Sequence, residues 1–237
     1  CYYDSEINSE GGDDMLDKLK NKLIVSCQAL PDEPLHSYFI MGRMAKAAKE
    51  GGASAIRAQG IEDIIEIKKV TGLPVIGLIK KKYNDSEVYI TPTLQEVDIL
   101  LTSGCEMIAL DMTDRQRPGG VQTASLVKRI HAAGRLVLAD ISTCDEGVAA
   151  EKLGADAIST TMSGYTEYSR HLKGPDIKLI EELTAKVSVP VFAEGRINTP
   201  SDIKKAMEAG AYAPIVGSAI TRPQIITKKF ADALLKN

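Results

Sequence analysis

Three apolar runs of this chain each end on an ionisable residue. PVIGLIK ends on Lys80, RLVLAD on Asp140 and VPVFAE on Glu194. Such Val- and Leu-rich runs are typical of buried parallel strands, and a charge at the end of such a strand costs free energy unless it opens into a cleft. An amine and two carboxylates around one mouth can take up and return protons. We therefore predict an acid–base site where these strands end.

Glycines in the last quarter of the chain predict a place for an anion. AEGRI at 193–197 and VGSAITRP at 216–223 each put a glycine directly after an apolar run. Glycine lets backbone N–H groups approach phosphate oxygens, and Arg222 can add a bidentate contact. Barrel proteins frequently bind phosphate in the loops after strands seven and eight. The pattern therefore indicates a phosphorylated ligand.

Apolar runs alternate regularly with amphipathic segments, and these elements must position the ionisable residues. We predict eight strands, at residues 22–28, 53–57, 73–80, 105–111, 135–140, 155–159, 189–194 and 211–217. A predicted helix follows each strand, at residues 38–50, 61–71, 94–103, 121–133, 144–153, 176–186, 200–209 and 223–235. For residues 85–91 the pattern predicts only an irregular excursion. Strands that alternate with helices favour an α/β fold with a parallel sheet.

Two classes of strand alternate along the chain. GGASAI, SGCEMIAL, LGADAIST and AGAYAPIVG open the even strands with glycine and small residues, whereas GLPVIG, GRLVLAD and SVPVFAE open strands three, five and seven. Odd and even strands of a TIM barrel fill different layers of its interior. We therefore predict a parallel, eight-stranded (β/α)8 TIM barrel. The alternative, an open doubly wound sheet, is favoured by a GxGxxG turn after an early strand, which this sequence lacks.

Size and composition agree with one enzyme domain. Residues 15–237 suit a single barrel, while the acidic, Gly-rich residues 1–14 indicate a disordered tail or an expression remnant. A net charge of −3 gives no reason to expect nucleic acid or an anionic membrane as a partner. Four scattered cysteines without CxxC or metal spacing indicate free thiols in a reducing compartment. No apolar run reaches transmembrane length, and we expect a cytoplasmic protein.

In such a barrel the active site lies at the carboxyl ends of the strands. One charged residue at a strand end is as often a structural ion pair as a functional group, but polar residues at most of the strand ends favour function. The candidates are Gln28, Arg57, Lys80, Asp111, Thr113, Asp140, Thr160, Thr161, Glu194, Arg196, Gly217, Ser218 and Arg222. The sequence has only three histidines, which argues against a histidine-based metal centre, and we expect them on the surface or in loops.

From about Met15 onward the chain resembles the N-acetylmannosamine-6-phosphate 2-epimerase family of bacterial sialic-acid degradation. The resemblance is carried by LIVSCQALP, IRAQG, PVIGLIK, ALDMTDRQRP, LADIST, AEGRI and VGSAITRP, in this order. It implies a (β/α)8 barrel that uses no metal and no other cofactor. It also implies that Lys80 and Glu194 are catalytic and that Gln28, Arg57, Asp140 and Arg222 bind the substrate. Gly195, Arg196, Gly217 and Ser218 complete the predicted substrate-binding set. Pro214 departs from the family pattern, where a β-branched residue is expected.

The resemblance implies interconversion of N-acetyl-D-mannosamine 6-phosphate and N-acetyl-D-glucosamine 6-phosphate. Proton transfer at carbon 2 of the amino sugar needs a base and a stabilised enolate oxygen but no electron acceptor. Lys80 can be the base if desolvation lowers its pKa, although nearby carboxylates and the substrate phosphate oppose that lowering. Arg57 can polarise the carbonyl. A Schiff-base sugar-phosphate aldolase and a non-catalytic sugar-phosphate sensor remain as alternatives. The expected partner is a phosphorylated N-acetyl amino sugar, and a homodimer is left open.

Overall fold

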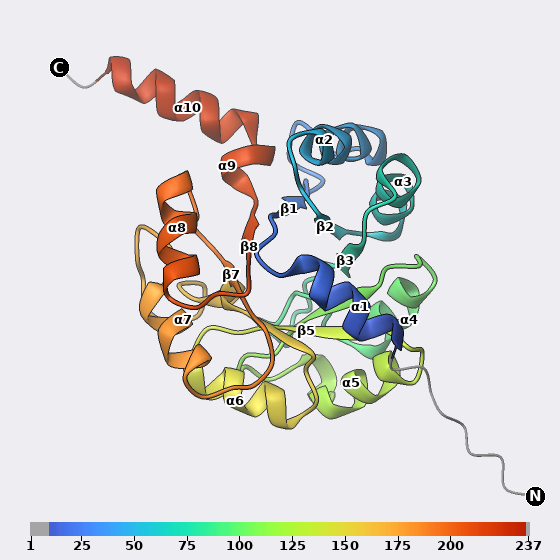
Figure 1. The fold of residues 1–237 in the computed structure, drawn as a ribbon. Coiled ribbons are helices and arrows are strands. Elements are labelled where there is room, and N and C mark those ends of the chain that lie inside the picture. Colours follow the sequence, from blue (N-terminus) through green and yellow to red (C-terminus); the bar gives the residue numbers. More distant parts are fainter. Residues whose placement is uncertain (1–9, 236–237) are drawn as a thin grey trace, which may run out of the picture.

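Eight parallel strands close into a barrel in the order of the chain (Figure 1). The computed structural model describes residues 10–235, with side chains from Met15 onward. The strands are β1 (Ile24–Cys27), β2 (Ala55–Gln59), β3 (Val75–Leu78), β4 (Met107–Asp111), β5 (Leu136–Asp140), β6 (Ala157–Ser159), β7 (Val191–Glu194) and β8 (Ala213–Val216). β1 pairs with both β2 and β8, which closes the ring. The predicted (β/α)8 barrel is confirmed.

One strand differs from its predicted bounds in a way that matters for the site. β2 continues to Gln59, past its predicted end at Arg57. Arg57 therefore stands within β2, in register with Ile76 of β3. Side chains alternate between the two faces of a strand, so Arg57 shares the inward face with Ala55. Pro214, the departure from the family pattern, lies within β8 opposite Ala193.

Helices surround the barrel, and the predicted ones appear within two residues of their expected bounds. Capping boxes begin α4, α6 and α8, where Thr93, Thr143 and Thr199 accept a backbone hydrogen bond. Only α9, in the expected glycine turn, was not foreseen as a separate helix after β8. The helices are α1 (Glu10–Leu19), α2 (Tyr38–Glu50), α3 (Ile61–Thr71), α4 (Leu94–Leu101), α5 (Thr123–His131), α6 (Cys144–Lys152), α7 (Ile177–Thr184), α8 (Pro200–Glu208), α9 (Ser218–Thr221) and α10 (Pro223–Leu234).

Helix α1 lies across one end of the barrel (Figure 1). It begins at Glu10, before the helix start that the sequence predicts at Met15, and the rest of the expected tail, residues 1–9, lies outside the described residues. Met15 and Leu19 are buried in the same apolar cluster as Phe192, which lies inside the barrel. α1 therefore plugs the amino-terminal end and leaves the carboxyl ends of the strands for a site.

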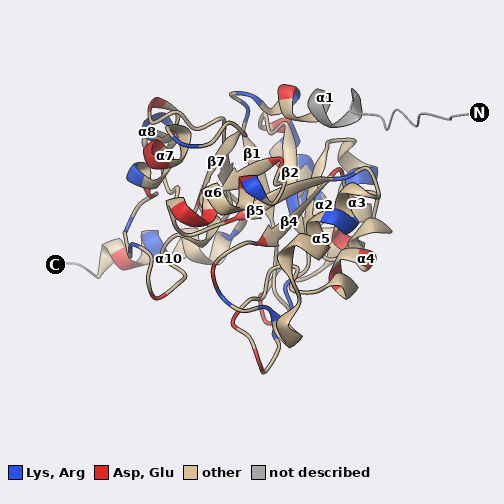
Figure 2. Ribbon diagram, turned by 90° about the horizontal axis from the view of Figure 1, so that it is seen from below, with Lys and Arg blue, Asp and Glu red and all other residues tan. Residues whose placement is uncertain are grey.

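A second apolar cluster fills the layer between the barrel and its helices. It joins outward-facing strand residues such as Ile56 and Ile108 to helix residues such as Ile64 and Leu126. On the outside, Lys and Arg are interspersed with Asp and Glu in the view of Figure 2. Within residues 10–235, no helix combines the length and the apolar character needed to cross a membrane.

The last helix leaves the barrel. α10 extends away from the strands (Figure 1), and none of its described residues is buried. Phe230 and Leu234 are 75% and 84% exposed. In a (β/α)8 barrel the helix after a strand ordinarily packs on the outside of the sheet. α10 does not cover the wall in this way, and its apolar face is free.

Candidate active site

A cleft of about 680 Å³ opens at the carboxyl ends of the strands. Asp140 does not line it and is fully buried beside Arg57. All the other residues that the resemblance implies line this cleft, namely Gln28, Arg57, Lys80, Glu194, Gly195, Arg196, Gly217, Ser218 and Arg222. Of the remaining candidates at the strand ends, Thr161 lines the cleft, whereas Thr160, Asp111 and Thr113 do not. The structure thus brings the predicted set together at one mouth, whereas the individual roles stay predictions.

Arg57 holds both carboxylates of the site. Its Nη1 and Nη2 donate to Asp140 Oδ1 and Oδ2 at 2.8 and 2.6 Å, and Nη1 also donates to Glu194 Oε2 at 2.8 Å. Burial acts to lower the pKa of Arg57, but the charges of Asp140 and Glu194 raise it overall. Arg57 is therefore a permanent cation whose terminal nitrogens are occupied. Its buried Nε has no hydrogen-bond partner among the described residues.

A threonine hydroxyl joins the same two carboxylates. Thr161 Oγ1, in the short 3-10 helix after β6, lies 2.7 Å from Asp140 Oδ1 and 2.8 Å from Glu194 Oε2. One hydroxyl carries one proton, so the second contact is favourable when that carboxyl group is protonated. Burial raises the pKa of Glu194, although the charge of Arg57 opposes this. The arrangement favours Glu194 as the carboxyl group that takes up a proton.

Lys80 is held in a setting that weakens its basicity. Within the described part of the chain, its ammonium has no hydrogen bond or ion pair. Burial and then the charges of Arg57 and Arg222 lower the pKa of Lys80 to about 8, although Glu194 and Asp140 act in the opposite direction. In the protein without a ligand, burial and the two arginines thus outweigh the carboxylates. At pH 7 about a tenth of Lys80 is neutral and able to accept a proton.

Glycine turns form the side of the cleft at β7 and β8. Gly195 has φ +99°, a conformation that residues with a side chain rarely adopt. A Cβ atom on Gly217 would meet Ser26 Cβ at 3.4 Å. Thr221 Oγ1 anchors the following turn by donating to the carbonyl of Ser26 at 2.8 Å. The first N–H groups of α9 have no acceptor within the helix, so they are available beside the cleft.

The two arginines at this side are held differently. Arg222 Nη2 donates to Glu33 Oε2 at 2.9 Å, and both side chains are partly exposed. Arg196 has φ +55°, and its Nε donates to the carbonyl of Gly174 at 3.1 Å. Its Cζ also lies 5.7 Å from the ring centre of Tyr165. Arg222 keeps donors for a ligand, whereas Arg196 mainly ties the β7 turn to the loop after β6.

Between β3 and α4 the chain folds into a hairpin, where the sequence predicts only an irregular excursion. Lys80 pairs with Ile90, and Tyr83 pairs with Ser86, through isolated antiparallel bridges. This folding brings Tyr89 and Ile90 to the cleft. The segment is short and largely polar, so it carries no clear hydrophobic periodicity from which the pairing could be predicted.

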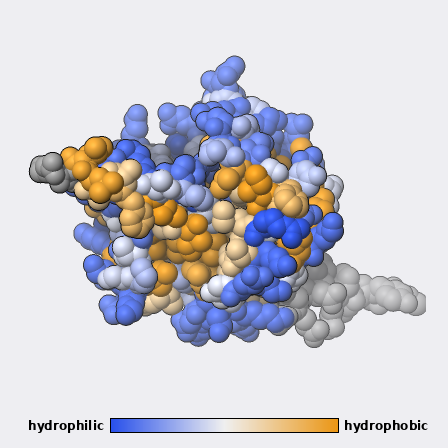
Figure 3. All heavy atoms as spheres, turned by 90° about the horizontal axis from the view of Figure 1, so that it is seen from above, coloured by the Kyte–Doolittle hydropathy of each residue, from blue (hydrophilic) through white to orange (hydrophobic). Residues whose placement is uncertain are grey.

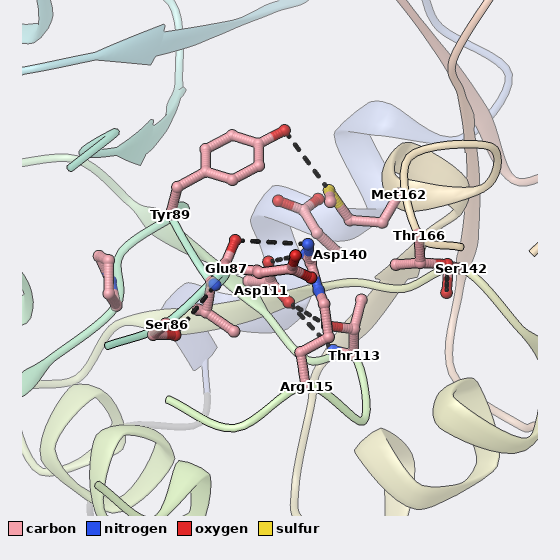
Figure 4. A network of polar contacts seen from close by, with 12 residues as sticks. Ser86, Glu87, Tyr89, Asp111, Thr113, Arg115, Asp140, Ser142, Met162 and Thr166 are labelled. Atoms are coloured by element: carbon pink, nitrogen blue, oxygen red, sulfur yellow. Dashed lines mark hydrogen bonds and ion pairs between the residues drawn. The ribbon is translucent and has the colours of Figure 1, made fainter. Parts of the chain in front are cut away.

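Asp111 and Thr113, predicted at the end of the fourth strand, do not line the cleft. Arg115 Nη2 donates to Asp111 Oδ2 at 2.7 Å, and Thr113 Oγ1 donates to Asp111 Oδ1 at 2.7 Å (Figure 4). Arg115 Nη1 also donates to the carbonyl of Glu87 in the hairpin at 3.3 Å. These residues join β4 to the hairpin. The ion pair of Asp111 is therefore structural and not part of the cleft.

Fold and site together define a (β/α)8 barrel with an acid–base cleft. A family model described as "Putative N-acetylmannosamine-6-phosphate epimerase" matches residues 41–236. The chain belongs to this epimerase family, and it is therefore an enzyme of the isomerase class. The resemblance on which the sequence analysis relied is confirmed.

Relatives and solved structures agree with this membership. Proteins of Clostridium perfringens (strain SM101 / Type A) and Clostridioides difficile (strain 630), both named "Putative N-acetylmannosamine-6-phosphate 2-epimerase", are 64% and 63% identical over 220 residues. These matches cover 93% of this chain and 100% and 99% of the relatives. The solved N-acetylmannosamine-6-phosphate 2-epimerase from Clostridium perfringens has a TM-score of 0.91 at 60% identity, over 98% of this chain and 99% of that one. Thiamine phosphate pyrophosphorylase from Pyrococcus furiosus, with a TM-score of 0.60 at 19% identity over 93% of this chain and 98% of that one, shares the fold alone.

Proposed function

We propose that this protein interconverts N-acetyl-D-mannosamine 6-phosphate and N-acetyl-D-glucosamine 6-phosphate by moving the proton on carbon 2 from one face to the other. The observation that carries the proposal is the meeting of Lys80 and Glu194 in one cleft. Lys80 follows β3 and Glu194 ends β7, and these strands lie across the closed barrel from each other. The two groups can therefore approach a bound sugar from opposite sides.

Lys80 is the proposed base. The proton on carbon 2 is acidic in the open-chain sugar, because the carbonyl at carbon 1 accepts the electron pair that it leaves behind. With its pKa lowered to about 8, Lys80 has a neutral fraction near pH 7 and remains a competent base. A lysine at its ordinary pKa would be almost fully charged at this pH.

The carboxylates have separate proposed roles. Glu194, whose pKa is raised by burial, carries the proton for ring opening or for return to carbon 2. Asp140 has both oxygens engaged by Arg57, so we assign it to holding Arg57 and Glu194 in place. Gln28 Oε1 is buried without a hydrogen-bond partner among the described residues, which supports a contact with a sugar hydroxyl or amide N–H.

The phosphate is assigned to the glycine turns after β7 and β8. Gly195, Gly217 and Ser218 line this side of the cleft, and Arg222 stands at its edge. Backbone N–H groups and a guanidinium are the donors that a phosphate prefers. The likeness of this arrangement to phosphate-binding barrels supports a phosphorylated sugar over a neutral one.

Family membership favours an epimerase over the two alternatives that the sequence leaves open. A sensor needs the binding residues but not both Lys80 and Glu194. An aldolase would form an imine between Lys80 and the sugar, which borohydride would trap as a stable adduct. We expect no such adduct.

The proposed function is tested by NMR in deuterated water. With N-acetyl-D-mannosamine 6-phosphate as substrate, we expect the 2-epimer to form with deuterium at carbon 2, because the base exchanges its proton with solvent. Lys80→Met removes the base and should abolish turnover, and unphosphorylated N-acetylmannosamine should remain a poor substrate for the unchanged protein. A product without deuterium after many turnovers in both directions would contradict an exchangeable proton transfer.

Independence from a metal and from a redox cofactor stays a prediction. Among the side chains that the structure describes, no group of three or more His, Cys, Asp and Glu residues is suited to hold a metal ion. We expect the same turnover after treatment with a chelator and after addition of a nicotinamide cofactor. Activity that is lost to the chelator and restored by a divalent ion would contradict the prediction.

A homodimer in the cytoplasm is the proposed assembly and location. Phe230, Leu234 and Leu235 of the C-terminal segment are 75%, 84% and 82% exposed. Figure 3 shows hydrophobic side chains gathered beside this helix on one face of the molecule. A second copy offers both an apolar helix and an apolar wall, so it can cover both on the first copy. The unpaired, buried thiols Cys27, Cys105 and Cys144 support a reducing compartment. The net charge of −3, with Lys and Arg positions interspersed with Asp and Glu positions along the ribbon in Figure 2, supports the absence of a nucleic-acid partner.

A further inference from the structure

The hairpin between β3 and α4 carries a tyrosine side chain into the active-site cleft. Tyr89 lines the cleft, and its hydroxyl points toward Met162 (Figure 4). Met162 Sδ, at 3.9 Å, is the only hydrogen-bond partner of this hydroxyl among the described residues. A thioether sulfur is a weak acceptor. The Tyr89 hydroxyl is therefore a donor that is nearly unused inside a polar cleft.

The hairpin fixes Tyr89 between two strands. The N–H of Lys81 donates to the carbonyl of Tyr89 at 2.9 Å, which joins the two arms of the hairpin. The N–H of Asp111, at the end of β4, donates to the carbonyl of Ile90 at 3.1 Å. The backbone at the tyrosine is thus tied to the segment that follows β3 and to β4, and the ring is placed before a ligand arrives.

Backbone strain marks the base of this hairpin. Thr91 has φ +45°, a value that β-branched residues rarely adopt. Its N–H donates to the carbonyl of Ile79 at 2.7 Å, and Arg117 Nη1 donates to its carbonyl at 3.1 Å. Such strain persists only where the surroundings hold it, and it is typical of segments that shape a functional site. Here it turns the chain directly after Tyr89 and Ile90.

Tyr89 faces the end of the ligand opposite to the phosphate. The phosphate is assigned to the turns after β7 and β8, whereas the hairpin is inserted between β3 and β4 on the other side of the closed barrel. A hexose held by its 6-phosphate therefore extends carbons 1 and 2 toward the hairpin. Lys80, the proposed base for carbon 2, stands at this same end, which agrees with the orientation.

Arg57, the residue expected to polarise the carbonyl, has its terminal nitrogens engaged elsewhere. Nη1 donates to Asp140 and Glu194, and Nη2 donates to Asp140. These contacts aim the guanidinium at the two carboxylates, so a donor for the oxygen on carbon 1 is better supplied by another side chain of the cleft. Burial, followed by the charges of Asp111 and Asp140, raises the pKa of Tyr89 to about 12, so its hydroxyl keeps its proton throughout the neutral range.

We propose that the Tyr89 hydroxyl donates a hydrogen bond to the oxygen on carbon 1 of the open-chain amino sugar. This inference rests on the proposed function. In the step that it serves, the proton on carbon 2 goes to Lys80 Nζ, the C–H electron pair forms the double bond between carbons 1 and 2, and the carbonyl electron pair moves onto oxygen 1. Tyr89 keeps its own proton. A donor that is fixed beforehand stabilises the charge developing on oxygen 1.

The test compares Tyr89→Phe with Tyr83→Phe and with the unchanged protein, by steady-state epimerisation of N-acetyl-D-mannosamine 6-phosphate. Tyr83 lies on the same hairpin, but its hydroxyl donates to Glu96 at 2.9 Å and does not line the cleft. We expect Tyr89→Phe to lower kcat about 10- to 100-fold with KM changed less than about threefold, because the lost contact is strongest in the transition state. Tyr83→Phe should keep both constants near those of the unchanged protein.

The other possible outcomes distinguish a failure of the proposed function from a failure of the Tyr89 assignment alone. An inactive unchanged protein overturns the proposed function and, with it, the assignment of Tyr89. An active protein whose Tyr89→Phe variant has the same kcat overturns the assignment of Tyr89 alone. A rise in KM at constant kcat also overturns it, because the contact would then stabilise the bound substrate and the transition state equally. The inhibition constant of inorganic phosphate, expected to be equal in all three proteins, shows that the opposite end of the cleft is intact.

Discussion

Lys80 illustrates how the surroundings of one residue decide its chemistry. It is one of three successive lysines, and its pKa is lowered because burial and two arginines outweigh the carboxylates. Its neighbour Lys81 has a raised pKa, in which hydrogen bonds to Tyr83 and Glu96 are the main causes. A positive charge that is buried near other positive charges opposes folding. The proposed base should therefore reduce the stability of the protein that carries it.

Replacing Lys80 by Met should stabilise the fold at neutral pH. The pKa of Lys80 falls from 10.5 to about 8 on folding, so the unfolded chain binds the proton more tightly and the folded protein bears a penalty of up to about 3 kcal/mol below pH 8. This penalty disappears as the pH rises from about 8 to about 10.5. Urea unfolding should show Lys80→Met to be more stable than the unchanged protein at pH 7, by a difference that shrinks at pH 10.

Lys82→Met is the matched control, because Lys82 is exposed. Its free energy of unfolding should stay within about 0.5 kcal/mol of that of the unchanged protein at both pH values. If Lys80→Met were less stable than the unchanged protein at pH 7, the charge of Lys80 would be well accommodated, and its assignment as a base with a lowered pKa would be wrong.

At the scale of elements, the repeating strands and helices can be predicted from the sequence, whereas contacts between residues far apart in the chain cannot. Strand ends such as Lys80 and Glu194 could be located, because hydrophobic periodicity and barrel topology place them at one mouth. The extension of β2 beyond Arg57 could not, because a charged residue ordinarily ends an apolar run. Arg57 is accommodated in the interior by Asp140 and Glu194, which lie 83 and 137 positions further along the chain, and no local pattern contains those contacts. The β3–α4 hairpin is not predicted for a different reason, because its short and largely polar segment carries no clear hydrophobic periodicity.

The turn after β8 provides the prediction that belongs to this scale. Arg222 precedes α10 and is oriented by Glu33 from the loop after β1. Arg222→Ala should weaken binding of the 6-phosphate sugar by roughly 1.5–3 kcal/mol, about 10- to 100-fold in Kd, because a charge-assisted hydrogen bond is lost. Calorimetric titration on the inactive Lys80→Met background measures this change without turnover.

Arg129→Ala serves as the control for that titration. Arg129 also pairs with a carboxylate, Asp98 at 2.7 Å, but on the outer surface of the barrel. Its removal should leave the Kd of the 6-phosphate sugar unchanged, and neither variant should alter the poor binding of the unphosphorylated sugar. An unchanged Kd for Arg222→Ala would place the phosphate elsewhere in the cleft.

For the molecule as a whole, the charge of the cleft differs in sign from the charge of the chain. The net charge is −3, and yet the cleft is lined by many more cations than anions. Glu194 is the acidic member, whereas the basic members are Arg57, Lys80, Lys81, Lys82, Arg196 and Arg222. Net charge therefore gives no reason to expect an extended polyanion as a partner and says little about a small anionic ligand, for which the field inside the cleft decides.

The exposed face of α10 leads to a prediction about assembly. Phe230 and Leu234 lie one turn apart on this face, while Lys228 and Asp232 form an ion pair at 2.8 Å on the opposite face. If a second copy covers the apolar face, Phe230→Ser removes about 1.5–3 kcal/mol of burial from each copy of a symmetric dimer. Its dimer dissociation constant should then rise about 100-fold or more.

Sedimentation equilibrium measures this change directly. We expect the unchanged protein to have twice the chain mass of 25.5 kDa at micromolar concentration and the Phe230→Ser variant to shift toward the single chain. Lys228→Ser introduces the same residue into the same helix on its charged face, so it should leave the dimer intact. A single-chain mass for the unchanged protein would show that the apolar face of α10 is not covered by a second copy. Equal dissociation constants for the two variants would place the dimer contact on another surface. An interface through the apolar face of α10 is weakened by Phe230→Ser but not by Lys228→Ser.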